Sequence, residues 1–319
     1  MLRRIAILFL VGFSSCNPYR FAEHHVRFAV SRAGLRYHTL VTEKYTLGYW
    51  DSENDKPALI LIQGLGADAE FHWYKQVGEL GKYRVIVPDL LYFGKSIPQK
   101  DNFSADAQVN AIKVLIDKLD LKTFDLCGFS YGGLIAAELA KSEPERIQKL
   151  ILMDAPVKFF IREDMQPLLD KFGMKEPSEL LVPEDAKAMK ELSSVIYAHP
   201  PNIPVSFYKS FQENMYEHHA TAYKNILRTL EKDRTHFERQ EYNFNFPVLL
   251  VWGEKDPMVP PEVGVQLEHY IGSNAEFHLI AGTSHVPNLE RPQEFNRILL
   301  KFLNKPNEPN GNPEISTAR

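Results

Sequence analysis

The sequence has only two cysteines among its 319 residues, Cys16 and Cys127. No cluster of cysteine and histidine has the spacing of metal ligands, so we expect no metal site. An excess of basic residues is also lacking, because the formal net charge is −4. Proteins that bind nucleic acids need a basic surface for the phosphates, so no nucleic-acid partner is expected.

A long hydrophobic run is lacking at the amino terminus. The apolar run of residues 5–13 is too short for a membrane-spanning helix, which takes about 20 residues. Arg3 and Arg4 precede this run and small serines follow it, which is the layout of a secretory signal peptide. We therefore predict a signal peptide over residues 1–15, with an uncleaved anchor or a chance apolar start as alternatives.

The four residues that end at Cys16 resemble the bacterial lipobox, although Phe13 stands where leucine is usual. This resemblance implies that Cys16 is lipidated, becomes the mature amino terminus and anchors the protein to a membrane of a bacterial envelope. A secreted or periplasmic protein is the alternative. Cys127 would then be the remaining thiol, so no internal disulfide is expected, and we predict a small buried side chain there.

The rest of the chain alternates between buried strands and helices. Continuous apolar runs predict strands at residues 58–62, 84–87, 124–127, 150–153 and 248–252, after two more strands at 37–42 and 44–50. Helical patterns cover residues 105–119, 131–142 and 292–303. This order predicts an α/β fold with a mostly parallel, doubly wound sheet.

One long segment interrupts the alternation. Residues 157–243 contain helical patterns at 184–197 and 205–232 and many aromatic side chains, which pack in a core or line a substrate cavity. We interpret this segment as a helical cap inserted into an α/β core of residues 17–156 and 244–303. The last residues, 304–319, are too polar to pack and are expected to be disordered.

Residues 17–33 can form a short amphipathic helix before the first strand. Phe21, Val26 and Val30 form its apolar side. We expect this side to pack against the domain, with a membrane-surface role as the alternative if Cys16 carries lipid.

The segment that carries chemistry is Gly128-Phe-Ser-Tyr-Gly132, which directly follows a predicted strand and directly precedes a predicted helix. This is the pattern of a nucleophile elbow with Ser130 as nucleophile. Gly128 and Gly132 are expected because strand and helix nearly touch at such a turn and leave no room for side chains.

A serine hydroxyl needs a base, and His285 lies in a loop between the apolar segment 277–280 and the last helix. His72 and His199 are the weaker candidates. The acid that orients the base should follow a buried strand, and Asp256 does so. Glu254 and Asp154 are its rivals, with a structural turn the favoured role of Asp154.

An oxyanion hole needs two backbone N–H groups. Tyr131, directly after the nucleophile, should supply one. The loop of residues 63–66 after an early strand should supply the other, which we assign to Leu65.

These segments, in this order, resemble the α/β-hydrolase superfamily, particularly its lipase and esterase branch that includes monoacylglycerol lipases. The likeness runs over residues 33–303. Gln63 stands where the family usually has histidine, and Ser284 where it usually has glycine.

The resemblance implies a serine hydrolase that cleaves carboxylic esters through an acyl-enzyme, with a small-molecule ester as its partner and no cofactor. The alternatives are a C–C bond hydrolase or a cofactor-free haloperoxidase with the same triad. A non-catalytic lipoprotein that keeps the fold for binding is a further alternative. The oligomeric state and the natural substrate are not predicted by the sequence.

Overall fold

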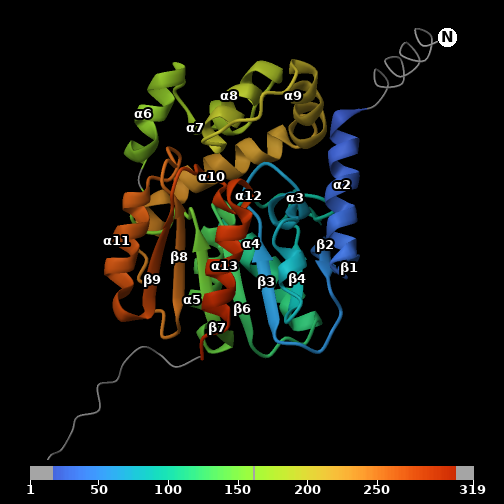
Figure 1. Cartoon of the computed structure of the whole chain (residues 1–319), viewed down its shortest axis with the longest axis vertical. Coiled ribbons are helices and arrows are strands. Elements are labelled where there is room, and N and C mark those ends of the chain that lie inside the picture. The colour runs from blue at the N-terminus through green and yellow to red at the C-terminus, as the bar shows by residue number, and fades with distance from the viewer. Residues whose placement is uncertain (1–16, 161, 307–319) are drawn as a thin grey trace, which may run out of the picture.

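The computed structural model describes residues 17–160 and 162–306 (Figure 1). The predicted signal peptide, Cys16 and residues 307–319 of the predicted tail lie outside this part of the chain. Within it, one nine-stranded sheet runs in the order β1-β2-β4-β3-β6-β7-β8-β9, with β5 paired to β2. Strands β3, β4, β6, β7, β8 and β9 are mutually parallel, and β2 joins them in antiparallel fashion. The predicted fold class is confirmed.

The strands in the middle of the sheet are buried on both faces, as their continuous apolar sequences require. The strands are β1 (Arg36–Val41), β2 (Tyr45–Asp51), β3 (Ala58–Ile62), β4 (Arg84–Pro88), β5 (Ile97–Pro98), β6 (Phe124–Phe129), β7 (Ile147–Met153), β8 (Val248–Gly253) and β9 (Ala275–Ile280).

Helices cover both faces of the sheet and enclose two hydrophobic cores. One core is formed against α4 (Ala105–Lys118), α5 (Tyr131–Ser142) and α11 (Pro261–Ile271). The other is formed against α3 (Ala69–Trp73) and α13 (Pro292–Leu303), with the short α12 (Pro287–Glu290) before α13.

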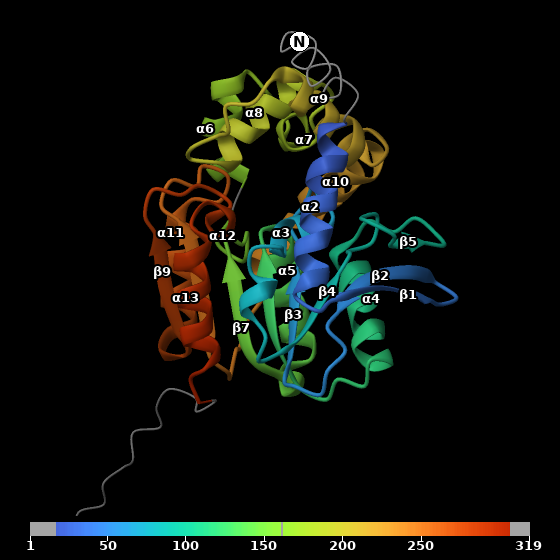
Figure 2. The same cartoon turned by 45° about the vertical axis from the view of Figure 1, so that its right-hand side comes forward.

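Five helices between β7 and β8 form a cap over the carboxyl ends of the parallel strands (Figures 1 and 2). They are α6 (Arg162–Phe172), α7 (Pro177–Leu181), α8 (Ala186–Ile196), α9 (Val205–Gln212) and α10 (Ala220–Arg239). The helical stretch predicted over residues 205–232 is divided, because a π-helical turn, Glu213–Glu217, separates α9 from α10. The domain limits at residues 157 and 243 stay a prediction.

Helix α2 (Pro18–Arg32) runs along one side of the molecule from the cap toward β1 (Figure 2). Tyr19, Val26 and Val30 are buried, whereas Phe21 is 76% exposed. Phe21 therefore does not belong to the packed side of this helix, contrary to expectation. Among the helices that the structure describes, α2 included, none combines the length and apolar character needed to cross a bilayer.

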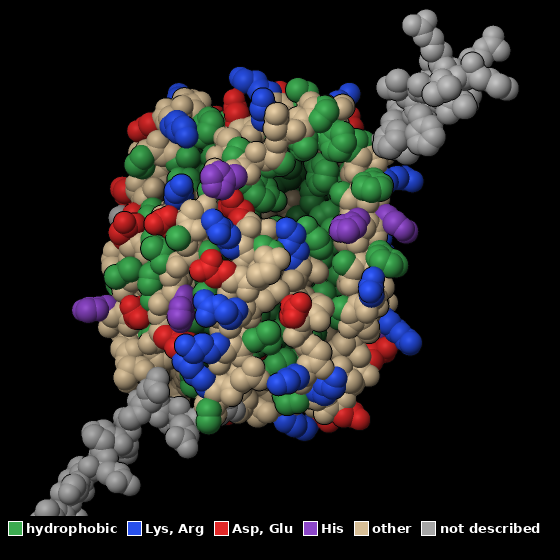
Figure 3. All heavy atoms as spheres, in the orientation of Figure 1, with side chains coloured by type: hydrophobic (Ala, Val, Ile, Leu, Met, Phe, Trp, Pro, Cys, Tyr) green, Lys and Arg blue, Asp and Glu red, His purple; other side chains and the backbone are tan. Residues whose placement is uncertain are grey.

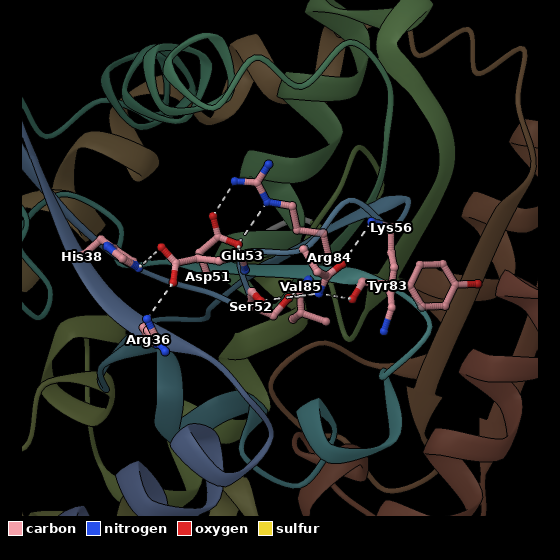
Figure 4. Close-up of polar contacts among 10 residues, drawn as sticks. Arg36, His38, Asp51, Ser52, Glu53, Lys56, Tyr83, Arg84 and Val85 are labelled. Atoms are coloured by element: carbon pink, nitrogen blue, oxygen red, sulfur yellow. Dashed lines mark hydrogen bonds and ion pairs between the residues drawn. The ribbon is translucent and has the colours of Figure 1, made fainter.

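A polar network fixes β4 against β2 at the antiparallel end of the sheet (Figure 4). Arg84 donates two hydrogen bonds to the Asp51 carboxylate, at 3.1 and 2.7 Å. The Ser52 hydroxyl accepts the Val85 N–H at 2.9 Å. Asp51 is almost completely buried, so its carboxylate depends on the Arg84 guanidinium for charge neutralisation.

Candidate active site

Ser130 lies in the turn between β6 and α5. Its backbone has φ +50° and ψ −122°, a conformation that non-glycine residues rarely adopt and that functional sites often hold. The turn is fixed because Ser130 N–H donates to the Met153 carbonyl at 2.9 Å and its own carbonyl accepts from Gly133 N–H at 2.8 Å. The hydroxyl is thus presented at the carboxyl end of the sheet, beneath the cap.

The glycines on either side of the turn lie where no side chain fits. A Cβ atom at Gly128 would come within 2.7 Å of the Cβ of Ala136. At Gly132, a Cβ would lie 2.8 Å from the Ile62 carbonyl oxygen and closer still to that of Gln63. Strand β6, helix α5 and the loop after β3 therefore touch around Ser130.

The structure brings together the three side chains that the sequence singles out. His285 Nε2 lies 2.9 Å from the Ser130 hydroxyl, and His285 Nδ1 lies 2.7 Å from Asp256 Oδ2. Asp256 and His285 come from the loops after β8 and β9 and are both buried. Asp256 Oδ1 accepts the backbone N–H groups of Met258 and Val259 at 2.8 and 3.2 Å, which fixes the carboxylate toward the imidazole.

Asp154, which follows β7, lies in the same buried region. Its Oδ1 accepts the Gly253 N–H at 2.9 Å, and ligand atoms of Asp154, Asp256 and His285 lie within 4.8 Å of one another. Burial, and then the negative charge of Asp256, raise the pKa of Asp154 well above its usual value. This shift favours the protonated form of Asp154.

Three donors of this kind could hold a cation in principle, but the bonding here does not favour it. The Asp256 and His285 atoms already bond to each other, and the raised pKa of Asp154 disfavours the ionised carboxylate that a metal ligand needs. The rival acid Glu254 is exposed, and its carboxylate accepts the Gly282 N–H at 2.8 Å.

The competing histidines do not bond to the serine. His72 on α3 is buried, and the Phe129 ring lies next to both His72 and His285, with centroid distances of 5.3 and 5.1 Å. Burial, together with nearby His285, lowers the pKa of His72 to about 4, so its imidazole is neutral. His199 is exposed, and its backbone N–H donates to Glu290 at 3.2 Å.

The loop after β3 runs directly against the nucleophile. A Cβ atom at Gly64 would lie 3.3 Å from the Ser130 Cβ, and Leu65 and Tyr131 line the same cavity as Ser130. The Gln63 side chain supports the loop, because its amide donates to the Ala67 carbonyl at 2.7 Å and its oxygen accepts the Leu90 N–H at 3.3 Å. Gln63 thus has a structural role.

Ser284, the other departure from the family pattern, is buried beside His285. Its hydroxyl donates to the Val195 carbonyl of α8 at 2.6 Å, and its N–H donates to Glu290 at 2.7 Å. The histidine loop is therefore bonded to the cap.

A cavity of about 620 Å³ lies between the cap and the sheet, and Ser130 and His285 are in its wall. Figure 3 shows a hollow lined by hydrophobic side chains on this face. The apolar side chains that line the cavity include Phe71, Leu134, Met165, Leu192, Phe211 and Met215.

Five charged residues of the cavity lining are paired with one another on the cap. Arg162 lies 3.4 Å from Glu176 and 3.3 Å from Glu231, and Arg234 lies 3.2 Å from Glu238. Most of the wall that a substrate meets near Ser130 is therefore apolar.

The sequence did not predict that helix α2 is part of this wall. Ala22, His25 and Val26 of α2 line the cavity. The helical spacing of apolar residues in 17–33 was the signal available in the sequence. Such periodicity alone does not tell a cavity wall from a packed core.

A family model described as alpha/beta hydrolase fold matches residues 57–292. The chain belongs to this family. The match covers β3 to the start of α13, and so includes the turn at Ser130 and the loops that carry Asp256 and His285.

Relatives in this family have different names. A 2-hydroxy-6-oxononadienedioate/2-hydroxy-6-oxononatrienedioate hydrolase of Paraburkholderia phymatum is 28% identical, over 80% of this chain and 90% of that protein. Lipase 3 of Moraxella sp. TA144 is 30% identical, over 75% of this chain and 76% of that protein. A provisionally assigned lipase of Acinetobacter baumannii AYE has a similar structure, with a TM-score of 0.77 at 24% identity over 88% of this chain and 95% of that one. The chain is thus an α/β-hydrolase, and its relatives are named for the cleavage of different bonds.

Proposed function

We propose that this hydrolase cleaves carboxylic esters with apolar acyl groups. The observation that carries the proposal is the hydrogen-bonded row of Ser130, His285 and Asp256, which opens into a mostly apolar cavity. A serine activated by such a row is the nucleophile of acyl transfer, and an apolar cavity suits an acyl chain.

In the proposed reaction the Ser130 oxygen attacks the ester carbonyl carbon while His285 Nε2 takes the hydroxyl proton. Asp256 holds the imidazole in the tautomer that accepts this proton and stabilises the imidazolium. The N–H groups of Leu65 and Tyr131 bind the oxyanion of the tetrahedral intermediate. His285 then protonates the leaving alcohol.

Water completes the cycle. His285 removes a proton from the water, whose oxygen attacks the acyl carbon, and the bond to the Ser130 oxygen breaks as His285 returns the proton to that oxygen. The carboxylic acid leaves and the serine hydroxyl is restored. These steps use side chains and backbone groups of this chain and need neither a metal nor an organic cofactor.

The proposed substrates are monoacylglycerols or esters of short to medium acyl chains. The lining of the cavity supports this class, and so does the name of the Moraxella relative, Lipase 3. We propose further that the protein is exported and anchored through a lipidated Cys16. The mass of the mature amino terminus tests this anchor, and an unmodified Cys16 would contradict it.

A C–C bond hydrolase is the second candidate, because the P. phymatum relative is named for such a dienedioate and matches 80% of this chain. A dioate carries two carboxylates, which need cations in the site. Arg162 and Arg234, which line the cavity here, are paired with glutamates, and Lys158 lies 3.7 Å from Glu241. Arg228 bonds to the neutral Asn225 side chain and is the cation that a carboxylate could meet. The pairing of the other three favours the uncharged ester.

Two measurements decide between the candidates. Labelling by a fluorophosphonate probe should occur in the native protein and disappear in Ser130→Ala. p-Nitrophenyl esters of increasing chain length should then be hydrolysed, whereas a vinylogous diketone should not. Turnover of the diketone alone would assign the C–C reaction, and a native protein that takes no label would indicate a binding protein without catalysis.

A further inference from the structure

Large apolar side chains are exposed at the end of the molecule where α2 meets α9. Phe21 of α2 is 76% exposed, and Val205 and Phe207 of α9 are 62% and 37% exposed. We call these three residues the apolar rim. Phe28, also exposed, continues the side of Phe21 two helical turns further along α2.

The two helices of the rim are held together firmly. Asn17 Oδ1 accepts a hydrogen bond from the Ser210 hydroxyl at 2.5 Å, and the Tyr19 and Phe211 rings meet edge to face at 5.6 Å. Because α2 and α9 are held together, the apolar rim is one surface and not two separate groups of side chains.

Helix α2 is also bonded to the core near the nucleophile. Arg27 donates to the Glu70 carboxylate of α3 at 3.0 Å, and the Trp50 indole donates to the same carboxylate at 3.3 Å. Tyr19 stacks on Phe71, also of α3, at 5.7 Å. Because α3 follows the loop of Leu65, the rim has a fixed position relative to Ser130.

The rim borders the cavity. Ala22 follows Phe21 and Tyr208 follows Phe207, and both line the cavity, as do Pro201 and Ile203 just before α9. In Figure 3 the hollow opens between hydrophobic side chains on this face. The rim residues are thus direct neighbours in sequence of residues in the cavity wall on both helices.

The sequence before α2 indicates what covers the rim. Phe21 is five residues after Cys16, and the apolar run of residues 5–13 precedes that cysteine. Five residues span at most about 18 Å, so a lipid or apolar segment that holds residue 16 at a bilayer also keeps Phe21 close to its surface. A lipid surface is the occupant that the neighbouring sequence favours.

We propose that the apolar rim inserts into the surface of a lipid bilayer and that the cavity draws its ester directly from the membrane. The proposal rests on the proposed ester hydrolase for the identity of what enters, but the insertion itself does not depend on catalysis. Large apolar and aromatic side chains at a bilayer surface contribute binding in proportion to the apolar area that they bury.

The kinetic test uses the full-length protein with vesicles of phosphatidylethanolamine and phosphatidylglycerol that contain 1-oleoylglycerol. Activity on this ester is divided by activity on soluble p-nitrophenyl butyrate. Phe21→Glu combined with Phe207→Glu should lower this ratio about tenfold or more, because it places charge where the bilayer is apolar. The soluble activity should stay within about twofold, since neither residue lines the cavity.

Val41→Glu and Ile97→Glu serve as matched controls. Both side chains are exposed apolar residues, at 71% and 64%, but they lie on β1 and β5 at the antiparallel edge of the sheet. Their ratio should equal that of the native protein. An equal loss in the controls, an unchanged ratio in the rim variant, or an equal loss on both substrates would overturn the proposal.

A second measurement is independent of catalysis. The three native tryptophans are buried, so a tryptophan introduced by Val205→Trp reports on the rim. Brominated lipids in the vesicles should quench this residue, and should not quench Val41→Trp. Quenching in a protein that hydrolyses no ester would contradict the proposed function and support the insertion. Absent or equal quenching would overturn the insertion whatever the activity.

Discussion

Two buried carboxyl groups, Asp154 and Asp256, lie close to His285, and they have different hydrogen-bond partners: Asp256 bonds to the imidazole and Asp154 to the Gly253 N–H. Asp256 should behave as the triad acid, so Asp256→Asn should lower kcat for p-nitrophenyl butyrate by about 10³- to 10⁴-fold through the wrong imidazole tautomer. Asp154 does not bond to His285, its raised pKa favours the uncharged form, and an asparagine oxygen can still accept the Gly253 N–H. Asp154→Asn should therefore lower kcat by less than about tenfold.

The comparison is internally controlled, because the two substitutions are the same and both sites are buried. Thermal unfolding should show that each variant is folded. A loss in Asp154→Asn as large as that in Asp256→Asn would contradict the assignment of Asp256 as the acid that orients His285.

Gly132 packs against the start of the loop after β3, the loop that carries Leu65. Gly132→Ala should destabilise the protein by about 1–3 kcal/mol, because its methyl group overlaps the carbonyls of Ile62 and Gln63. It should also reduce kcat more than it reduces the folded fraction, because the loop that carries Leu65 must move. Gly78→Ala is the control, since no heavy atom lies near its added methyl group. Urea unfolding and ester kinetics of both variants check the prediction.

At the scale of elements, the pair of Asp51 and Arg84 joins β2 to β4. Asp51→Ala should lower the free energy of unfolding by about 2–3 kcal/mol, because it leaves the partly buried Arg84 guanidinium without its partner. Arg36→Met should change it by less than about 0.5 kcal/mol, because Arg36 is exposed and lies 3.7 Å from Glu53. Urea titration measures both, and equal effects would refute the distinction.

The central elements follow directly from the sequence. Residues 58–62 and 131–142 have the predicted bounds, because burial on both faces makes a strand continuously apolar and the elbow marks the first residue of α5. The break between α9 and α10 was missed, since residues 205–232 contain neither glycine nor proline to mark it. Amphipathic periodicity indicates a helix but not where tertiary contacts bend it.

The same limit applies to the candidate site. Ser130, Asp256 and His285 could be predicted because each lies in the turn or loop that follows a recognisable strand. The position of Asp154 beside them could not, because which strands are neighbours depends on the sheet order: β7 lies between β6 and β8. The contribution of α2 to the cavity depends on tertiary packing for the same reason.

The whole molecule should lose stability as the pH rises through the weakly acidic range. Burial, then the charges of Glu70 and Asp68, raise the pKa of Asp89 to about 7. The unfolded chain releases this proton near pH 4, whereas the folded protein keeps it until about pH 7, so the free energy of unfolding falls between these values.

In Asp89→Asn the free energy of unfolding should fall less steeply with rising pH, by up to about 1.4 kcal/mol per pH unit. Urea titrations at pH 4.5, 6 and 7.5 measure it. Asp125→Asn is a useful comparison, because burial raises the pKa of Asp125 only to about 6, so its effect should end one pH unit lower. An unchanged slope in Asp89→Asn would show that this carboxyl does not hold its proton in the folded protein.

The wall that α2 adds to the cavity has a consequence for how selectivity is compared across the family. The family match begins at residue 57, after α2 has ended. Homologues can therefore share every reacting group and still differ in the helix that covers this side of the cavity. Residues 18–32, outside the common core, are where differences in the room beside Ser130 should be sought.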